Sequence, residues 1–276
     1  MNDYLIIGAG FLGRELISWL QNHKIITVNK TRNSTKELVL RFPKITAIAT
    51  NILNKEHHLE SRMIVSNFKG TVFCLLPPSS FGQKAIDSSI SNLLTFFEVS
   101  SVRRAILVSS TSVYSESSGG KVICDSDTFP YNFRSTRLLQ IEERWRKMQW
   151  DSVIVRFAGI YGKERIVGRS SLRNKTALDG SGKEWLNLIH VVDAARALAR
   201  IANASRPQST YLLTDGHPLV RKDYYEVLAN KYGFDAPRFK NHKSDSSSKL
   251  CDSSADWNNL GITPYFANAI ALLNAK

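Results

Sequence analysis

The feature that most constrains the fold is a glycine-rich turn close to residue 10. The apolar run at residues 4–7 leads directly into Gly8-x-Gly10-x-x-Gly13, and apolar residues then recur at helical spacing to about residue 22. A strand, a tight turn and a helix in this order begin a βαβ unit of the kind that binds dinucleotides. An ordinary turn is the alternative interpretation, because glycines also occur in turns that bind nothing.

Each glycine has a separate task in such a unit. Gly8 would form the turn, Gly10 would let the backbone approach a pyrophosphate, and Gly13 would let the helix pack closely on the strand. The first N–H groups of the helix, from Phe11, Leu12 and Gly13, would then bind the phosphates.

Strand and helix patterns alternate along the first half of the chain. Besides residues 4–7, β-rich apolar runs lie at 25–28, 45–49, 71–76, 105–108 and 152–157, and helical patterns lie at 11–22, 35–41, 81–100 and 136–148. This alternation predicts an α/β fold: a doubly wound parallel sheet, Rossmann-like, with a smaller C-terminal substrate lobe. We expect a dinucleotide-binding domain at 1–157 and the lobe at 158–276, with residues 186–215 returning to the core.

The second half of the chain is less regular. Its patterns predict a helix at 191–203, a strand at 210–214, a surface connection at 243–254 and a short helix at 265–274.

The chain is strongly basic, with 37 Lys and Arg against 24 Asp and Glu and a formal net charge of +13. This balance is typical of proteins that bind nucleic acid, anionic membranes or phosphorylated ligands, and host-wide composition is the alternative explanation. The basic residues are scattered rather than gathered in one tract, which argues against nucleic acid as a partner.

Membrane and metal functions find no support in the sequence. No apolar run approaches the roughly 20 residues that a membrane span needs. The 3 cysteines lie far apart and lack metal-ligand spacing. We therefore expect a soluble, cytoplasmic protein without a metal site or a disulfide framework.

Later segments, together with the glycine motif, resemble a known family. They are Ser109-Ser-Thr-Ser-Val-Tyr114, Arg156-Phe-Ala-Gly-Ile-Tyr-Gly162 and Leu188-Ile-His-Val-Val-Asp193, preceded by a strand that ends in Leu75-Leu-Pro-Pro78. Their order resembles that of the extended short-chain dehydrogenases/reductases of the NAD(P)-dependent epimerase/dehydratase type. The resemblance implies a nicotinamide cofactor, contacts to it from Leu75 and Pro77, and a small-molecule substrate.

The resemblance also implies where the chemistry would occur. The family's active-site Ser or Thr falls at Ser110, four residues before Tyr114; a hydroxyl that caps the strand end is the alternative. The family's acid/base pair, a tyrosine followed four residues later by a lysine, is missing from this chain. The tyrosine position falls on Arg134 or Ser135, and the lysine position falls on Leu138 or Leu139. If the alignment is shifted by one residue, the two positions are Phe133 and Arg137.

Two explanations of the missing pair stay open. Tyr131 could act as a different acid, with Arg137 as a source of positive charge, and Tyr114 could act in its place although it is better read as a packing residue. Alternatively, proton transfer has been lost while the cofactor pocket is retained.

The end of the second strand indicates which cofactor is preferred. NAD enzymes commonly place Asp or Glu there, whereas this chain has Asn29, followed by Lys30 and Arg32. An amide removes the repulsion of a 2′-phosphate and the basic residues could pair with it, so we predict NADP rather than NAD. An ordinary basic loop is the alternative. Asn51 resembles the family's adenine-contacting Asp position.

The segment at 163–175 is rich in Lys and Arg, in the region where the family builds its substrate lobe. It favours an anionic substrate such as a nucleotide-linked sugar, while a solvated basic helix face is the alternative.

The leading hypothesis is an NADP-binding oxidoreductase or epimerase-like enzyme acting on a small carbonyl or alcohol. The alternative is a non-catalytic NADP-binding redox sensor or partner-binding module. RNA binding would rest on net charge alone. A homodimer through the helices expected at 81–100 and 136–148 is a further expectation.

Overall fold

A computed structural model of the chain describes residues 3–54, 56, 68–81, 86–97, 101–114, 120–240 and 248–274. The chain divides into two compact units. Unit 1 comprises Met1–Ser109, Asn132–Val155 and Ala195–Thr210, and unit 2 comprises Ser110–Tyr131, Arg156–Ala194 and Tyr211–Lys276.

The central sheet has seven strands in the order β12-β7-β5-β4-β1-β2-β3. Their bounds are β1 (Asp3–Ile7), β2 (Lys24–Asn29), β3 (Thr46–Ala49), β4 (Gly70–Cys74), β5 (Arg104–Ser110), β7 (Asp151–Phe157) and β12 (Thr210–Leu213). Strand β1 pairs in parallel with both β2 and β4, so that Ile7 stands opposite Val28 and Cys74. The carboxyl ends of these three strands therefore meet at one edge.

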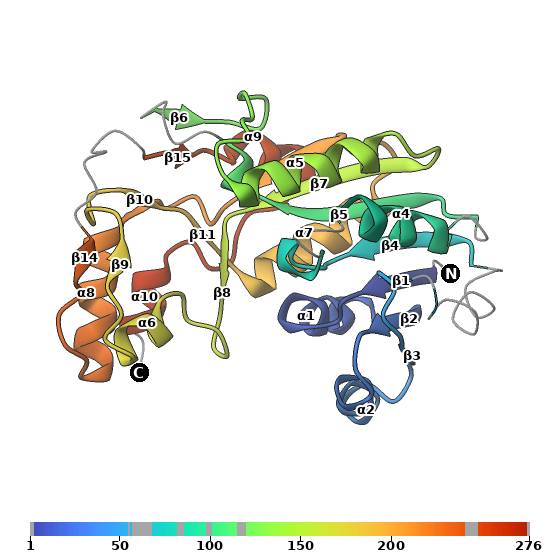
Figure 1. The fold of residues 1–276 in the computed structure, drawn as a ribbon, viewed down its shortest axis with the longest axis horizontal. Helices are drawn as coiled ribbons and strands as arrows, with labels where there is room; N and C mark the ends of the chain where they lie inside the picture. The colour runs from blue at the N-terminus through green and yellow to red at the C-terminus, as the bar shows by residue number, and fades with distance from the viewer. Residues whose placement is uncertain are drawn as a thin grey trace. The chain divides into compact units, whose positions relative to one another are not determined.

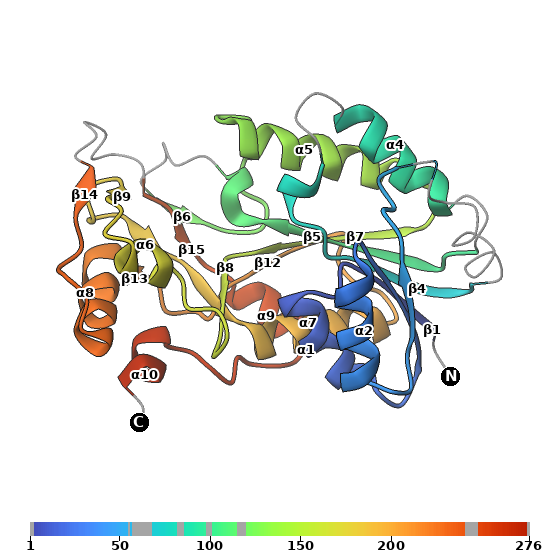
Figure 2. The same cartoon turned by 60° about the horizontal axis from the view of Figure 1, so that its bottom comes forward.

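Helices cover both faces of this sheet (Figure 1). The helices are α1 (Phe11–Leu20), α2 (Arg32–Arg41), α4 (Ile86–Phe97), α5 (Phe133–Arg146) and α7 (Val191–Asn203). Figure 2 shows α4 and α5 on one face and α1 and α2 on the other. Ile90, Leu93 and Trp145 pack on the first face, against buried strand residues such as Leu5 and Val72. The predicted doubly wound α/β fold is confirmed.

Unit 2 is built from short strands, short helices and a second core. Its remaining elements are η3 (Thr111–Val113), β6 (Lys121–Val122), β8 (Gly159–Tyr161), α6 (Arg169–Arg173), β9 (Leu178–Asp179), β10 (Trp185–Leu186), β11 (Leu188–His190), β13 (Leu219–Val220), α8 (Arg221–Tyr232), β14 (Phe239–Lys240), β15 (Leu250–Cys251), α9 (Ser254–Leu260) and α10 (Ala269–Asn274). Tyr224, Tyr225 and Leu228 of α8 pack with Leu172 and Leu188 in this core.

Side-chain caps move two helix starts away from the predicted positions. Helix α5 begins at Phe133 instead of residue 136, because Asn132 Oδ1 accepts the N–H of Ser135 at 2.9 Å and Ser135 Oγ accepts the N–H of Asn132 at 3.0 Å. Helix α2 begins at Arg32, because Thr31 Oγ1 accepts the N–H of Ser34 at 3.3 Å.

The helix expected at 265–274 begins only at Ala269. Its first expected turn is held open because the carboxylate of Asp193 accepts the N–H groups of Tyr265 at 2.8 Å and of Phe266 at 2.9 Å. The connection expected at 243–254 lies partly outside the described residues, and its later part contains β15. No helix in the described ranges is long and apolar enough to span a membrane.

Candidate functional site

The glycine turn lies at the carboxyl edge of β1 in unit 1. Gly8 has φ +86°, a left-handed conformation that side chains disfavour. Its N–H donates to Val28 O at 3.0 Å, and its carbonyl accepts the N–H of Gly10 at 2.8 Å. The first bond of α1 then runs from the Arg14 N–H to Gly10 O at 2.9 Å. The N–H groups of residues 11–13 precede that bond and are those that a helix start offers to an anion.

Gly13 and Gly10 differ in what requires them to be glycine. A Cβ on Gly13 would lie 3.1 Å from Gly8 O and 3.3 Å from both Ala9 Cβ and Leu75 Cδ1, so a side chain there would crowd its neighbours. A Cβ on Gly10 would meet no described atom within 4 Å, and Gly10 is exposed. Packing within the protein therefore does not require glycine at position 10.

The other predicted cofactor residues have distinct positions around this turn. Asn29 is buried, its Oδ1 accepts the Ala9 N–H at 3.0 Å and its Nδ2 donates to Thr27 Oγ1 at 3.3 Å. Its amide thus holds the glycine turn, a role that the sequence did not indicate. Lys30 and Arg32 are exposed beside it.

Three more of these residues lie at the carboxyl ends of neighbouring strands. Leu75 donates its N–H to Ile7 O at 2.9 Å and contacts the position of Gly13. Pro77 is exposed and caps η2 (Pro78–Ser80), and Asn51, half-buried, follows β3.

Two charged side chains of α5 are buried in unit 1. Glu142 accepts the Ser109 hydroxyl at 2.5 Å and pairs with Arg146 at 3.1 Å, which ties α5 to the end of β5. Arg137 is also buried, and its Nη1 donates to Pro78 O at 3.0 Å. Phe133, one turn earlier, stacks on this guanidinium, with Cζ 4.1 Å from the ring centroid.

Ser110 lies in unit 2 at the end of β5. Its Oγ accepts the Ser112 N–H at 3.2 Å and donates to Ser112 Oγ at 3.1 Å, so it caps the short helix η3. The capping alternative thus describes its local geometry, and the catalytic role stays a prediction.

The segment after Ser110 folds back on itself. The Phe129 N–H donates to Val113 O at 2.8 Å, and Tyr114 and Thr128 form an antiparallel bridge. This pairing carries Tyr131 toward the same end of the hairpin as Ser110.

Tyr131 has a cationic neighbour that the sequence did not reveal. Lys249 lies with Nζ 5.9 Å from the centroid of the Tyr131 ring, and the same ammonium donates to Tyr114 O at 3.2 Å. Tyr131 is 38% exposed, so solvent and solutes reach its side chain. Lys249 comes from the segment just before β15, and no motif spacing connects it to Tyr131.

Tyr114 itself is enclosed. Its phenol accepts from Arg156 Nη1 at 3.0 Å and donates to Cys124 O at 3.0 Å, and its side chain is fully buried. The packing role expected for Tyr114 agrees with these contacts. Of the three predicted catalytic residues, Ser110 and Tyr131 belong to unit 2 and Arg137 belongs to unit 1.

A buried polar cluster lies elsewhere in unit 2. Asp215 and Tyr161 are 2% and 5% exposed, and neither Asp215 Oδ2 nor the Tyr161 hydroxyl has a hydrogen-bond partner among the described residues. Burial raises the pKa of Asp215 to about 7 and also raises the pKa of Tyr161. Burial lowers the pKa of His190, which favours neutral imidazole. Its ring lies tilted against that of Phe266, with the two centroids 3.9 Å apart.

The cysteines offer no nucleophile. Burial raises the pKa of Cys74 and of Cys124 to about 12 and that of Cys251 to about 11, so all three are thiols at neutral pH. Within the described ranges, no group of three or more His, Cys, Asp or Glu residues could hold a metal ion.

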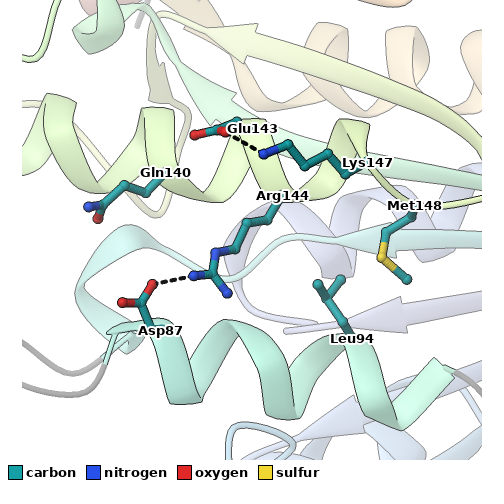
Figure 3. Close-up of a pocket in the computed structure, with 7 residues that line it drawn as sticks. All are labelled: Asp87, Leu94, Gln140, Glu143, Arg144, Lys147 and Met148. Atoms are coloured by element: carbon teal, nitrogen blue, oxygen red, sulfur yellow. Dashed lines mark hydrogen bonds and ion pairs between the residues drawn. The ribbon is translucent and has the colours of Figure 1, made fainter.

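Helices α4 and α5 border a hollow on the surface of unit 1 (Figure 3). In this hollow, Arg144 pairs with Asp87 at 2.6 Å and Lys147 pairs with Glu143 at 2.6 Å. Leu94 and Met148 line the apolar end of the hollow. None of the predicted site residues lines this hollow. It lies on the two helices expected to form a homodimer, and that assembly stays a prediction.

Comparison with known proteins gives a family match and a set of similar folds. Residues 4–213 match the model of the NAD dependent epimerase/dehydratase family. The chain is 29% identical over 195 residues to Protein YeeZ of Escherichia coli strain K12, a match that covers 69% of this chain and 65% of YeeZ. The match therefore spans slightly less than two thirds of that relative.

Solved structures resemble the whole chain. MoeE5 in complex with UDP-glucose and NAD has a TM-score of 0.77 at 20% identity, covering 99% of this chain and 96% of its own. The UDP-N-acetylglucosamine 4-epimerase of Methanobrevibacter ruminantium M1 has a TM-score of 0.76 at 17% identity, with coverages of 99% and 96%. WbmG of Bordetella bronchiseptica, in complex with NAD, has a TM-score of 0.77 at 16% identity, with coverages of 98% and 91%. At these identities the likeness establishes the fold.

Proposed function

The chain belongs to the NAD dependent epimerase/dehydratase family, and on that premise we propose that it is an NADP-dependent oxidoreductase or epimerase-like enzyme. The observation that carries the proposal is Gly10, which is glycine where the protein's own packing would accept a side chain. A glycine that packing does not require, at the start of a ten-residue helix, is suited to a dinucleotide pyrophosphate.

The residues of the turn fit such a cofactor. The N–H groups of Phe11, Leu12 and Gly13 would hold the pyrophosphate, and Asn29 would keep the turn in place through its bond to Ala9. A bound nicotinamide supplies a hydride acceptor or donor. Every other part of the chemistry must come from side chains of the protein.

We assign the preference for NADP to Lys30 and Arg32. Both are exposed after β2, and Asn29 places no carboxylate beside them. A 2′-phosphate would gain charge-assisted hydrogen bonds there. NADPH should bind more tightly than NADH, and Lys30→Glu combined with Arg32→Glu should reduce that ratio about tenfold or more, since each 1.4 kcal/mol is a factor of ten. Tighter binding of NADH by the unaltered protein would contradict the assignment.

We assign proton transfer to Tyr131, supported by the ammonium of Lys249. When a substrate alcohol is oxidised, its carbon would release a hydride, which a bound oxidised nicotinamide would take up. Its hydroxyl would release its proton to the Tyr131 phenolate, while Ser110 Oγ hydrogen-bonds the substrate oxygen. Reduction runs through the same groups in reverse. A cation near the ring favours phenolate, which is the form that accepts the proton.

The substrate class that the sequence favours is anionic. Lys163, Arg165 and Arg173 are exposed around α6, whereas Lys175 already pairs with Asp235 at 2.9 Å. Guanidinium groups suit diphosphates. UDP-sugars, which are bound to MoeE5 in its structure, are therefore the first substrates to try.

The test is turnover with a panel of UDP-sugars, aldehydes and ketones, followed by the absorbance of reduced nicotinamide and by product analysis for epimerisation. Tyr131→Phe and Ser110→Ala should each lower kcat about 100-fold or more. In the direction of alcohol oxidation, where Tyr131 accepts the proton as a phenolate, Lys249→Met should move the acidic limb of the pH–rate profile to higher pH, because the phenolate loses a nearby cation. Lys183→Met, which removes an exposed lysine of the same unit, is the matched control.

The same panel separates the alternative function. Tight NADPH binding without turnover on any substrate would favour a redox sensor or partner-binding module. Full activity in Tyr131→Phe would remove Tyr131 from the mechanism.

A further inference from the structure

Arg137 is a buried cation without a counter-ion in the described part of the chain. Its side chain is 6% exposed, and its Nη1 donates to Pro78 O at 3.0 Å. Neither Nε nor Nη2 has a hydrogen-bond partner among the described residues. Two guanidinium N–H groups are thus removed from water without an acceptor, an arrangement that costs free energy in the absence of a ligand.

The acidic residues of the same helix are engaged elsewhere. Glu142 binds Ser109 and Arg146, and Glu143 binds Lys147 at 2.6 Å. Phe133 stacks on the guanidinium and is itself 56% exposed. The ring covers the flat face of the cation and leaves the N–H edge for an acceptor in the guanidinium plane.

Arg137 is tied to the segment that borders the glycine turn. Pro78, its one carbonyl partner, lies three residues after Leu75, whose side chain contacts the position of Gly13. Leu76 contacts the position of Gly8. All these residues belong to unit 1 and lie at or beyond the carboxyl ends of the parallel strands β1 and β4. This edge is where doubly wound sheets bind their ligands.

We propose that the Nε and Nη2 groups of Arg137 bind a phosphate of a nucleotide ligand, as a second anion site beside the glycine turn. The inference rests on the proposed function for the identity of that ligand, and on the unpaired guanidinium for the site. The phosphate arrives either on the dinucleotide or on a nucleoside diphosphate that carries the substrate. Both present the same oxygens to the guanidinium.

If a ligand neutralises the unpaired buried charge of Arg137, removing that charge should change both the stability of the ligand-free protein and its affinity for the ligand. Arg137→Met replaces the cation with an apolar chain of similar length, so the variant without ligand should unfold at an equal or higher denaturant concentration than the unaltered protein. The same variant should bind the phosphorylated ligand at least tenfold more weakly. If Arg137 had a purely structural role, Arg137→Met would unfold at a lower denaturant concentration than the unaltered protein and would bind the phosphorylated ligand equally tightly.

The experiment measures denaturant unfolding and ligand affinity of the full chain with NADP, UDP and inorganic pyrophosphate as separate probes. Arg137→Lys keeps the charge but loses the fork, so intermediate affinity is expected, and it replaces Arg137→Met if that variant fails to fold. Arg144→Met, on the same helix but half-buried and paired with Asp87, is the matched control and should leave the affinities unchanged.

The three probes separate the possible outcomes. Weaker binding of NADP alone assigns the site to the dinucleotide, and weaker binding of UDP alone assigns it to the substrate. Weaker binding of pyrophosphate, in a protein that binds neither nucleotide, supports the anion site while the proposed function fails. Equal affinities of the unaltered protein and both Arg137 variants for all three probes would overturn the inference.

Discussion

At the scale of single residues, burial raises the pKa of the Asp215 carboxyl group to near neutral pH. Its Oδ1 accepts the His217 N–H at 3.0 Å, and its pKa is raised to about 7 from an ordinary value of 3.8, chiefly by burial. Between these two values the folded protein holds a proton that the unfolded chain has lost. The stabilising contribution of Asp215 is therefore full below about pH 4 and is lost as the pH rises through 7.

Asp215→Asn should remove this dependence. The free energy of unfolding of the unaltered protein, minus that of the variant, should fall by a few kcal/mol at most between pH 4 and pH 7, because one pKa unit corresponds to about 1.4 kcal/mol. Denaturant unfolding across this pH range provides the measurement.

Asp252→Asn serves as the control of opposite sign. Its pairing with Lys121 lowers the pKa of Asp252 to about 2, so its contribution is present above pH 4 and is lost only in stronger acid. A difference for Asp215→Asn that stays constant across the range would contradict the account of that residue.

At the scale of elements, Arg104 joins β5 to the end of α7. Its Nη1 donates to Ile201 O and Ala204 O, each at 2.7 Å, and its Nε donates to Asp151 at 2.6 Å. The side chain of Arg104 is 2% exposed, whereas that of Asp151 is 45% exposed. The contacts with the helix carbonyls are thus the buried part of the arrangement, and they satisfy groups that a helix end leaves unpaired.

Arg104→Met should lower the free energy of unfolding by about 3 kcal/mol, because several buried acceptors lose their donor together. Asp151→Asn should cost under about 1 kcal/mol, since solvent screens its part of the pair. Denaturant titration of both variants checks the ratio. Equal losses in the two variants would show that the ion pair, rather than the capping of α7, stabilises this end of the sheet.

Sequence patterns predicted those elements whose signal is local. The alternation of apolar runs indicated the strands of the parallel sheet, and the glycine spacing indicated the turn that positions Gly10. The sequence patterns did not predict helix α8. Its buried residues, among them Tyr224, Tyr225 and Leu228, are interspersed with charged residues, which weakens the helical period of the apolar residues.

The candidate site was predictable only in part, because sequence patterns report local signals and not contacts between distant segments. Ser110 follows from motif order, and Tyr131 was an alternative acid outside the motif. Lys249 lies near Tyr131 only through the folding of unit 2. No spacing in the sequence encodes that contact. Likewise, Asn29 was expected near a ribose, and only its bond to Ala9 N revealed that it supports the glycine turn.

On the scale of the whole molecule, the net charge of +13 gives every anionic ligand a favourable long-range potential. Salt screens this potential, since the Debye length shortens from about 10 Å at 0.1 M to about 3 Å at 1 M. NADPH carries one phosphate more than NADH. Raising the salt concentration from about 0.05 M to about 0.5 M should therefore weaken NADPH binding more than NADH binding, by about threefold or more. Parallel titrations at both salt concentrations check this, and an equal loss for the two dinucleotides would argue against a phosphate contact at Lys30 and Arg32.

The central claim, that this fold holds a nicotinamide dinucleotide on its glycine turn, is tested most directly by titrating NADPH into the unaltered protein and into Gly10→Ala and Gly13→Ala. Gly13→Ala should lose stability, because its Cβ would crowd Gly8 O at 3.1 Å. Gly10→Ala should stay folded, at a cost of about 1 kcal/mol from the weaker helix cap, yet bind NADPH at least about tenfold more weakly, because the new methyl occupies the path of the pyrophosphate. Failure of the unaltered protein to bind NADPH or NADH, or equal NADPH affinity in Gly10→Ala, would contradict the claim.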